Sequence, residues 1–254
     1  MGNLRLIARL DVRAPNLIKG VRMETVRIVG DPHVFAEAYY LQGIDEIIYM
    51  DVVASLYGRN TIVDLVRHTA ADVFIPMTVG GGVRAVEDAR ALLRAGADKV
   101  AVNSAATARP ELVTELARAF GSQCVVLSIE AKRRPTGGWE AYRDNGREHT
   151  GRDAVEWARL GQSLGAGEIL LTSVDRDGTC LGFDVDLVRA VSDAVTVPVI
   201  ASGGMGATEH LAHVVEHGRA DAVAMAHVLH YGKLALADIR QEAAARGLPV
   251  RMAA

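Results

Sequence analysis

The chain has 254 residues and a formal net charge of −3, and half of its residues are hydrophobic while only 5% are aromatic. A high apolar fraction with a small net charge excludes an intrinsically disordered chain. Because basic residues are not in excess, we expect no charge-driven binding of nucleic acid. No apolar run reaches the roughly 18 residues that a membrane-spanning helix needs, so we expect no membrane span either.

The N-terminal segment and the cysteines bear on where the protein works. Arg5, Arg9 and Asp11 interrupt the first apolar stretch, which therefore lacks the core of a signal peptide. The two cysteines, Cys124 and Cys180, have no metal-ligand spacing. Both features predict a reduced, cytoplasmic protein.

Short β-branched runs alternate with longer stretches rich in Ala, Leu, Arg and Glu along the chain. Strands are predicted at 4–10, 46–52, 74–79, 99–103, 124–130, 168–173, 197–202 and 221–225. Helices are predicted between them, most clearly at 86–95, 110–120, 154–164, 186–194 and 210–217. Helix-ending glycines are expected at Gly43, Gly96, Gly121, Gly165 and Gly218. Strands that alternate with helices indicate a parallel sheet, either closed or doubly wound.

An internal repeat favours the closed form. GIDEIIYMDV at Gly43 matches GAGEILLTSV at Gly165, and IPMTVGGGV at Ile75 matches VPVIASGGM at Val197. The offset of 122 residues becomes 123 after one insertion and stays in register over some 60 residues. We therefore predict one α/β domain over residues 1–254, a (β/α)8 TIM barrel built from two homologous half-barrels, about 1–122 and 123–254.

Two acids stand at the predicted strand ends where such barrels carry their chemistry. Asp11 follows the first strand of one half, and Glu130 ends the first strand of the other. Two carboxylates that face each other can divide general-acid and general-base work when their environments separate their pKa values. The alternative is a pair of solvated loop acids, and the symmetric placement favours catalysis.

Two glycine clusters, Gly81-Gly82 and Gly203-Gly204, follow equivalent strands. Glycine lets backbone N–H groups approach an anion closely, and a helix N-terminus follows each cluster. Two such turns predict a substrate with a phosphate at each end, although tight turns alone would also explain the glycines. Further candidate substrate contacts at strand ends are Asn103, Ser104, Thr172, Asp177, Ser202, Ala226 and His227.

Two long segments interrupt the regular pattern. The stretch 12–30 is long for a connection and is expected to be a lid loop, in which Lys19 meets a phosphate or closes on the substrate; a flexible solvated loop is the alternative. The stretch 131–151 is predicted to form a hairpin that turns at Gly137-Gly138. The eight histidines show no metal-ligand spacing, so we expect no metal site and no cofactor.

Charged residues of both signs open four of the predicted strands, at Arg5, Glu46, Lys99 and Glu168. They can close into a ring at the N-terminal mouth of the barrel. Such a ring can serve stability alone, because the bottom face of these barrels usually does.

Taken together, these segments resemble one family, the cyclase subunit of imidazole glycerol phosphate synthase, known as HisF. The resemblance covers essentially the whole chain. Its motifs are ARLDV at Ala8, LIKG at Leu17, GDP at Gly30, GIDEI at Gly43, TVGGGV at Thr78, GADKVAVN at Gly96, FGSQ at Phe120, GAGEILLTSVDRDGT at Gly165 and ASGG at Ala201. The sister isomerase of the pathway is less similar in the long motif and in the charged ring.

The resemblance implies an enzyme of histidine biosynthesis. Such cyclases add ammonia to a phosphoribulosyl-formimino-aminoimidazole-carboxamide ribotide and release imidazole glycerol phosphate and aminoimidazole-carboxamide ribotide. The acids at the positions of Asp11 and Glu130 carry the proton transfers. A glutaminase subunit docks on the N-terminal face and sends ammonia through the barrel. The four-charge ring matches the family's ammonia gate, and Asp98 matches a position at the glutaminase interface.

Four departures from the family lie near the predicted chemistry. The family has Asp at the position of Glu130 and Cys at that of Arg9. It has Asp-Gly where this chain has Ala14-Pro15, and commonly Ser where this chain has His227. By strand alternation Arg9 points into the lumen, and because an unpaired charge there is costly, we hypothesise that it pairs with Asp11 or Glu130.

The departures keep two alternatives open. One is a divergent paralogue that works with a glutaminase to aminate or amidinate another acceptor, such as a nucleotide-linked surface sugar. The other is a non-catalytic barrel that only activates a glutaminase. The intact glycine clusters argue against the second alternative.

Overall fold

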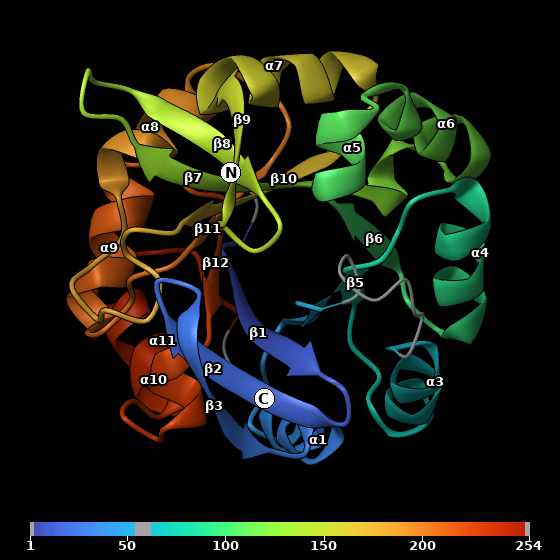
Figure 1. Cartoon of the computed structure of the whole chain (residues 1–254). Coiled ribbons are helices and arrows are strands. Elements are labelled where there is room, and N and C mark those ends of the chain that lie inside the picture. The colour runs from blue at the N-terminus through green and yellow to red at the C-terminus, as the bar shows by residue number, and fades with distance from the viewer. Residues whose placement is uncertain (1–2, 54–61, 252–254) are drawn as a thin grey trace.

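In the computed structural model, which describes residues 3–53 and 62–251, eight parallel strands close into a barrel (Figure 1). Each strand pairs with the next, and the last pairs with the first. In order around the barrel the strands are β1 (Arg5–Arg13), β4 (Glu46–Asp51), β5 (Met77–Gly80), β6 (Lys99–Val102), β7 (Val125–Arg133), β10 (Glu168–Ser173), β11 (Val199–Ser202) and β12 (Ala222–Met225). The predicted (β/α)8 barrel is therefore confirmed.

Helices lie outside the strands around the barrel (Figure 1). They are α1 (Pro32–Leu41), α3 (Ile62–Asp72), α4 (Val86–Ala95), α5 (Ser104–Ala108), α6 (Glu111–Phe120), the 3-10 turn η1 (Ser122–Cys124), α7 (Ala154–Leu164), α8 (Val185–Ser192), α9 (Thr208–Glu216), α10 (His227–His230) and α11 (Leu236–Ala245). In the part of the chain that the structure describes, no helix is long and apolar enough to cross a membrane.

Most predicted bounds agree with the structure to within a few residues. The predicted start of β5 at Phe74 is wrong, because Phe74 is 72% exposed and pairing begins only at Met77. Gly218 does not end its helix in the left-handed region; Arg219 does so instead, with φ 60°.

The expected lid loop at 12–30 is not a loop. It folds as the strands β2 (Asn16–Val21) and β3 (Glu24–Gly30), and β2 pairs antiparallel with the extended end of β1. Lys19 is consequently held in a strand and is only 4% exposed.

The second insertion takes the same form in the other half. β7 continues beyond the barrel, turns at Gly137-Gly138 as predicted, and pairs with β8 (Trp139–Arg143), which then pairs with β9 (Glu148–Asp153). Asp31 and Asp153, which are 122 residues apart, cap the helices α1 and α7 with their side chains. Residues of the two halves thus occupy equivalent places.

Strand alternation divides the core into two layers. On β1, Leu6, Ala8 and Leu10 pack outward against the helices, whereas Ile7 joins an inner cluster within the barrel. The other members of the inner cluster are Ile48, Met50, Ala101, Val126, Leu170, Ile200, Ala222 and Ala224. The lumen is therefore apolar through its middle, with charged side chains of β1 above and below it.

Candidate active site

The two predicted acids lie at the C-terminal mouth of the barrel, on the first strand of each half. Asp11 on β1 is 8% exposed and Glu130 on β7 is 5% exposed. Strand alternation points both side chains into the lumen. At these positions β1 pairs with β2 (Asp11 opposite Ile18) and β7 pairs with β8 (Glu130 opposite Tyr142). Neither side chain is a solvated loop acid.

Arg9 lies one step deeper in the lumen and is 4% exposed. Its Nε donates to Asp11 Oδ1 at 2.9 Å. Its Nη1 donates to Thr172 Oγ1 at 2.8 Å and to Ser202 Oγ at 3.2 Å. The predicted ion pair is therefore made with Asp11 rather than Glu130, and it joins β1 to the strands β10 and β11 of the other half.

The pKa values of the two acids move in opposite directions. Burial by itself raises the pKa of Asp11, but the positive charges of Arg9 and Lys19 outweigh it, so the pKa of Asp11 lies below its usual range. Burial raises the pKa of Glu130 to about 7, although Gly146 N–H donates to its carboxylate and Arg9 opposes the shift. Near neutral pH Asp11 is ionised while Glu130 exchanges a proton readily, which suits an acid/base pair.

Lys19 reaches the mouth from β2. Its Nζ lies 2.8 Å from Asp177 Oδ2 and 3.8 Å from Asp11 Oδ2. The structure thus brings three predicted residues together in one buried ion network. Lys19 reaches this network from a strand and not from an irregular loop.

The glycine turns after β5 and β11 are equivalent in their packing. Gly81 has φ 92°, and a Cβ atom there would lie 2.2 Å from the carbonyl oxygen of Asp51. Gly203 has φ 90°, and a Cβ atom there would lie 2.7 Å from the carbonyl oxygen of Ser173. Close backbone packing therefore requires glycine at both turns, and it leaves the backbone at the mouth open to an anion.

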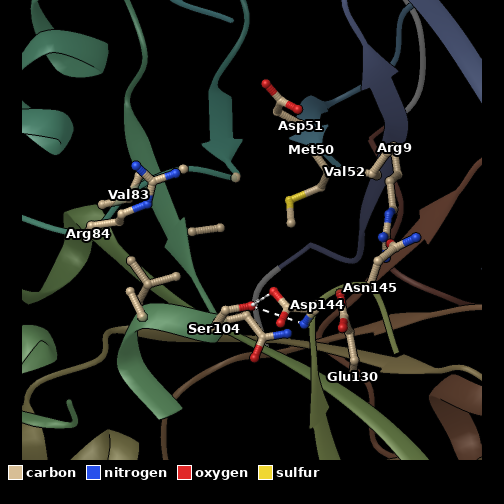
Figure 2. A pocket seen from close by; sticks show the side chains of 16 residues that line it. Arg9, Met50, Asp51, Val52, Val83, Arg84, Ser104, Glu130, Asp144 and Asn145 are labelled. Atoms are coloured by element: carbon tan, nitrogen blue, oxygen red, sulfur yellow. Dashed lines mark hydrogen bonds between the residues drawn. The ribbon is translucent and has the colours of Figure 1, made fainter. Parts of the chain in front are cut away.

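A cavity of about 250 Å³ opens at the first glycine turn. Its lining residues include Gly81, Gly82, Asn103 and Ser104, together with Arg9 and Glu130. Asp144 and Asn145, from the turn between β8 and β9, also line it (Figure 2). Ser104 Oγ donates to Asp144 Oδ1 at 3.2 Å, and Asp144 N–H donates to Ser104 Oγ at 3.1 Å (Figure 2).

A second, smaller cavity of about 20 Å³ lies at the other glycine turn. Its lining includes Gly203 and Gly204 with Ala226 and His227, at the start of α10. Burial lowers the pKa of His227, and Lys233 and Lys19 lower it further, so the ring is neutral near pH 7. Arg9 lines both cavities and therefore lies between the two predicted phosphate positions.

The four charges at the opposite mouth form a closed ring. The guanidinium nitrogens of Arg5 lie 2.9 Å from Glu46 Oε1 and 2.5 Å from Glu168 Oε1. Lys99 Nζ lies 2.8 Å from Glu168 Oε2 and 3.6 Å from Glu46 Oε2. The apolar inner cluster separates this ring from Arg9 and the acids. Only uncharged species would cross that layer cheaply.

The face around the ring carries a groove of about 990 Å³. Apolar parts of its lining come from Leu4, Pro198, Val215, Leu248 and Pro249. Asp98 lies exposed on the same end of the barrel, where its Oδ2 accepts from Met77 N–H at 2.8 Å, as Asp221 does from Val199 N–H in the other half. Its local contact is structural, and its predicted role at an interface stays a prediction.

Several residues of the mouth were not among the predicted site residues. Asp51 ends β4 and lines the first cavity, so the rule of strand ends would have indicated it. Asp144, Asn145 and Gly146 lie 14 to 16 residues beyond Glu130 and reach the mouth only through the fold of the two hairpins. The Asn145-Gly146 pair is a local signal for a hairpin turn, but nothing in the local sequence places that turn over the mouth.

Comparisons with known proteins agree with this architecture. Residues 5–235 match the family described as "Histidine biosynthesis protein". The chain is also 65% identical, over 209 residues, to a protein of Legionella pneumophila named "Imidazole glycerol phosphate synthase subunit HisF". That match covers 82% of this chain and 99% of the relative.

Proposed function

Since the chain belongs to the histidine biosynthesis protein family, and within it to the group of the imidazole glycerol phosphate synthase subunit HisF, we propose that it is the cyclase subunit of a glutamine amidotransferase. In this role it uses ammonia to convert the phosphoribulosyl-formimino-aminoimidazole-carboxamide ribotide into imidazole glycerol phosphate and aminoimidazole-carboxamide ribotide. The observation that carries the proposal is the pair of buried acids with separated pKa values between two glycine turns.

In this proposal each glycine turn holds one end of a substrate with two phosphates. Gly81 and Gly82 with Asn103 and Ser104 receive one phosphate, and Gly203 and Gly204 with Ala226 and His227 receive the other. Backbone N–H groups at such turns bind phosphate without needing a paired cation. The reacting centre then lies between them, beside Asp11, Glu130 and Arg9.

The acids divide the proton transfers. Ammonia must lose protons as it becomes a ring nitrogen, and ionised Asp11 accepts them. The departing amine must gain a proton, and Glu130, with its pKa of about 7, supplies it. Arg9 positions the Asp11 carboxylate and keeps it ionised through the 2.9 Å contact.

Ammonia reaches the acids through the barrel in this proposal. A glutaminase subunit covers the groove around Leu4 and Leu248, with Asp98 at its edge. Ammonia passes the ring of Arg5, Glu46, Lys99 and Glu168 and then the apolar lumen, which a neutral molecule crosses more cheaply than ammonium does.

One assay tests the proposal. The purified chain is supplied with ammonium and the histidine-pathway ribotide, and loss of substrate absorbance is followed. We expect turnover in the parent chain and its loss in Asp11→Asn. Lack of turnover in the parent chain, with stimulation of a glutaminase retained, would instead support the paralogue or the non-catalytic barrel.

The similarity to the Legionella protein favours the histidine-pathway substrate over another acceptor. Arg9 and Glu130 each have a hydrogen-bond partner at the mouth, Asp11 and the Gly146 N–H respectively. The double variant Arg9→Cys/Glu130→Asp restores the family's residues. Its cyclase rate shows directly what these two departures contribute.

A further inference from the structure

Two neighbouring helices on the outside of the barrel bring together three side chains that bind transition metals well. His33 lies in the first turn of α1, and His68 and Asp72 lie in the last turns of α3. One donor atom from each of the three lies within 4.8 Å of the others. The sequence spacing of the histidines did not show this group, because its members come from two helices.

The arrangement on α3 is favourable for chelation. His68 and Asp72 are four residues apart, so both project from the same face of the helix. Two ligands at this helical spacing bind one zinc ion in well-known metal sites. Both residues are exposed, so their side chains can rotate towards an ion without disturbing the core.

His33, on the neighbouring helix α1, lies close to both of these side chains. Its Nε2 lies 3.5 Å from Asp72 Oδ2, and its ring centroid lies 4.0 Å from that of His68. Bonds of 2.0–2.1 Å in a tetrahedron place neighbouring ligand atoms about 3.3 Å apart. The observed separation between His33 and Asp72 is therefore close to that of two ligands on one zinc ion.

We propose that His33, His68 and Asp72 form a binding site for a divalent transition-metal ion, with zinc as the favoured ion and water as the fourth ligand. Two imidazoles and one carboxylate are a donor set that suits zinc better than magnesium or calcium. The site joins α1 to α3 and is separate from the acids of the barrel mouth.

The affinity of the site is expected to be moderate. A metal-bound histidine is normally oriented by an acceptor at its other ring nitrogen, and removal of such a partner costs about 10- to 100-fold in affinity. Among the residues that the structure describes, His33 Nδ1 has no hydrogen-bond partner. Occupancy therefore adds stability rather than being required for folding.

Cobalt and zinc binding to the untagged full chain test the proposal. After chelator treatment, Co²⁺ titration should produce visible absorption bands of a tetrahedral site with one equivalent bound, and Zn²⁺ should displace it. At a zinc concentration 100 times the Kd, the melting temperature should rise by about 5–10 °C.

Matched variants locate the binding. His68→Ala and Asp72→Asn change exposed side chains and should each abolish the absorption bands and the thermal shift. His213→Ala is the control, because His213 and His217 form another exposed histidine pair with ring centroids 4.7 Å apart. Binding that is lost in His213→Ala, or that persists in His68→Ala, would overturn the proposal. Absence of saturable binding would leave the three side chains as a cluster without a metal and would overturn the proposal too.

Discussion

At the scale of single residues, the mouth of the barrel depends on how the buried Arg9 is placed relative to the two buried acids. Arg9 lowers the pKa of Asp11 by direct contact, whereas the Gly146 hydrogen bond and the more distant charge of Arg9 do not offset the effect of burial on the pKa of Glu130. Sequence alternation located Arg9 in the lumen. It could not choose between Asp11 and Glu130 as the partner, because both acids share that face.

Glu130→Gln is expected to lower the cyclase rate by about 10²- to 10⁴-fold, the usual contribution of a positioned proton donor. In the parent chain the protonated form of Glu130 is the donor, so kcat/KM should decrease as the pH rises through about 7. A pH profile of kcat/KM with ammonia held constant checks this. A profile that stays flat across pH 7 would remove Glu130 from this role.

The carboxyl group of Glu130 also makes the stability of the fold depend on pH. Its pKa in the folded chain, about 7, lies above the ordinary value of 4.5, so the folded state binds more protons between these values. The contribution of Glu130 to the free energy of unfolding should therefore decrease as the pH rises from 4.5 to about 7. Urea unfolding at several pH values should show a weaker pH dependence in Glu130→Gln than in the parent chain.

Arg9→Met removes one partner of a buried pair and is expected to reduce the free energy of unfolding by about 3–5 kcal/mol. Part of that cost comes from the uncompensated charge left on Asp11. The double variant Arg9→Met/Asp11→Asn should therefore be less destabilised than the sum of the single variants. Thermal unfolding of the four proteins measures this coupling, and strict additivity would contradict the ion pair.

At the scale of secondary-structure elements, the two hairpins after β1 and β7 shape the mouth. Long insertions were evident in the sequence, and the turn at Gly137-Gly138 was predicted correctly. The antiparallel pairing of β2 with β1 was not predicted, because pairing depends on the partner strand more than on the segment itself. The turn between β8 and β9 contacts Ser104 through Asp144 and Glu130 through the Gly146 N–H. These contacts were not predicted either, because they depend on how the hairpin packs against the barrel.

Asp144→Asn is expected to lower the KM of the phosphorylated substrate by about 3- to 10-fold, because it removes a negative charge beside the proposed phosphate position at Gly81 and Ser104. Asparagine tolerates the φ of 51° at this position, so the turn should be retained. Because Asp144 also helps to raise the pKa of Glu130, the pH profile should shift towards acid. Steady-state kinetics against pH measure both effects, and an unchanged KM would exclude a role of Asp144 in phosphate entry.

At the scale of the whole molecule, the barrel separates a charged ring at one mouth from the acids at the other by an apolar layer. Glu168 makes the two shortest contacts of the ring, at 2.5 Å to Arg5 and 2.8 Å to Lys99, whereas Glu46 contacts the same two cations at 2.9 and 3.6 Å. The strand register brings these side chains together, although they lie up to 163 residues apart.

Glu168→Gln is expected to change the glutamine-dependent rate of the proposed complex with a glutaminase several-fold, because the ring loses one negative charge and is no longer closed by ion pairs. The rate with added ammonium should change much less, since ammonium reaches the mouth from solution. Arg189→Met, which removes an exposed ion pair with Asp193 on α8, is the control. Equal changes in both rates would indicate a purely structural ring.

The sequence alone determined the strand and helix pattern, the 122-residue repeat, both acids and the glycine turns, because these follow from local periodicity and from residue types with few alternatives. Only the tertiary structure decided which charges pair, that 12–30 forms strands, and that Asp144 reaches Ser104. Those contacts join residues far apart in the chain, and their energies depend on burial and distance, which the order of residues does not give. The same reason explains why His33, His68 and Asp72 became visible as a group only in the fold.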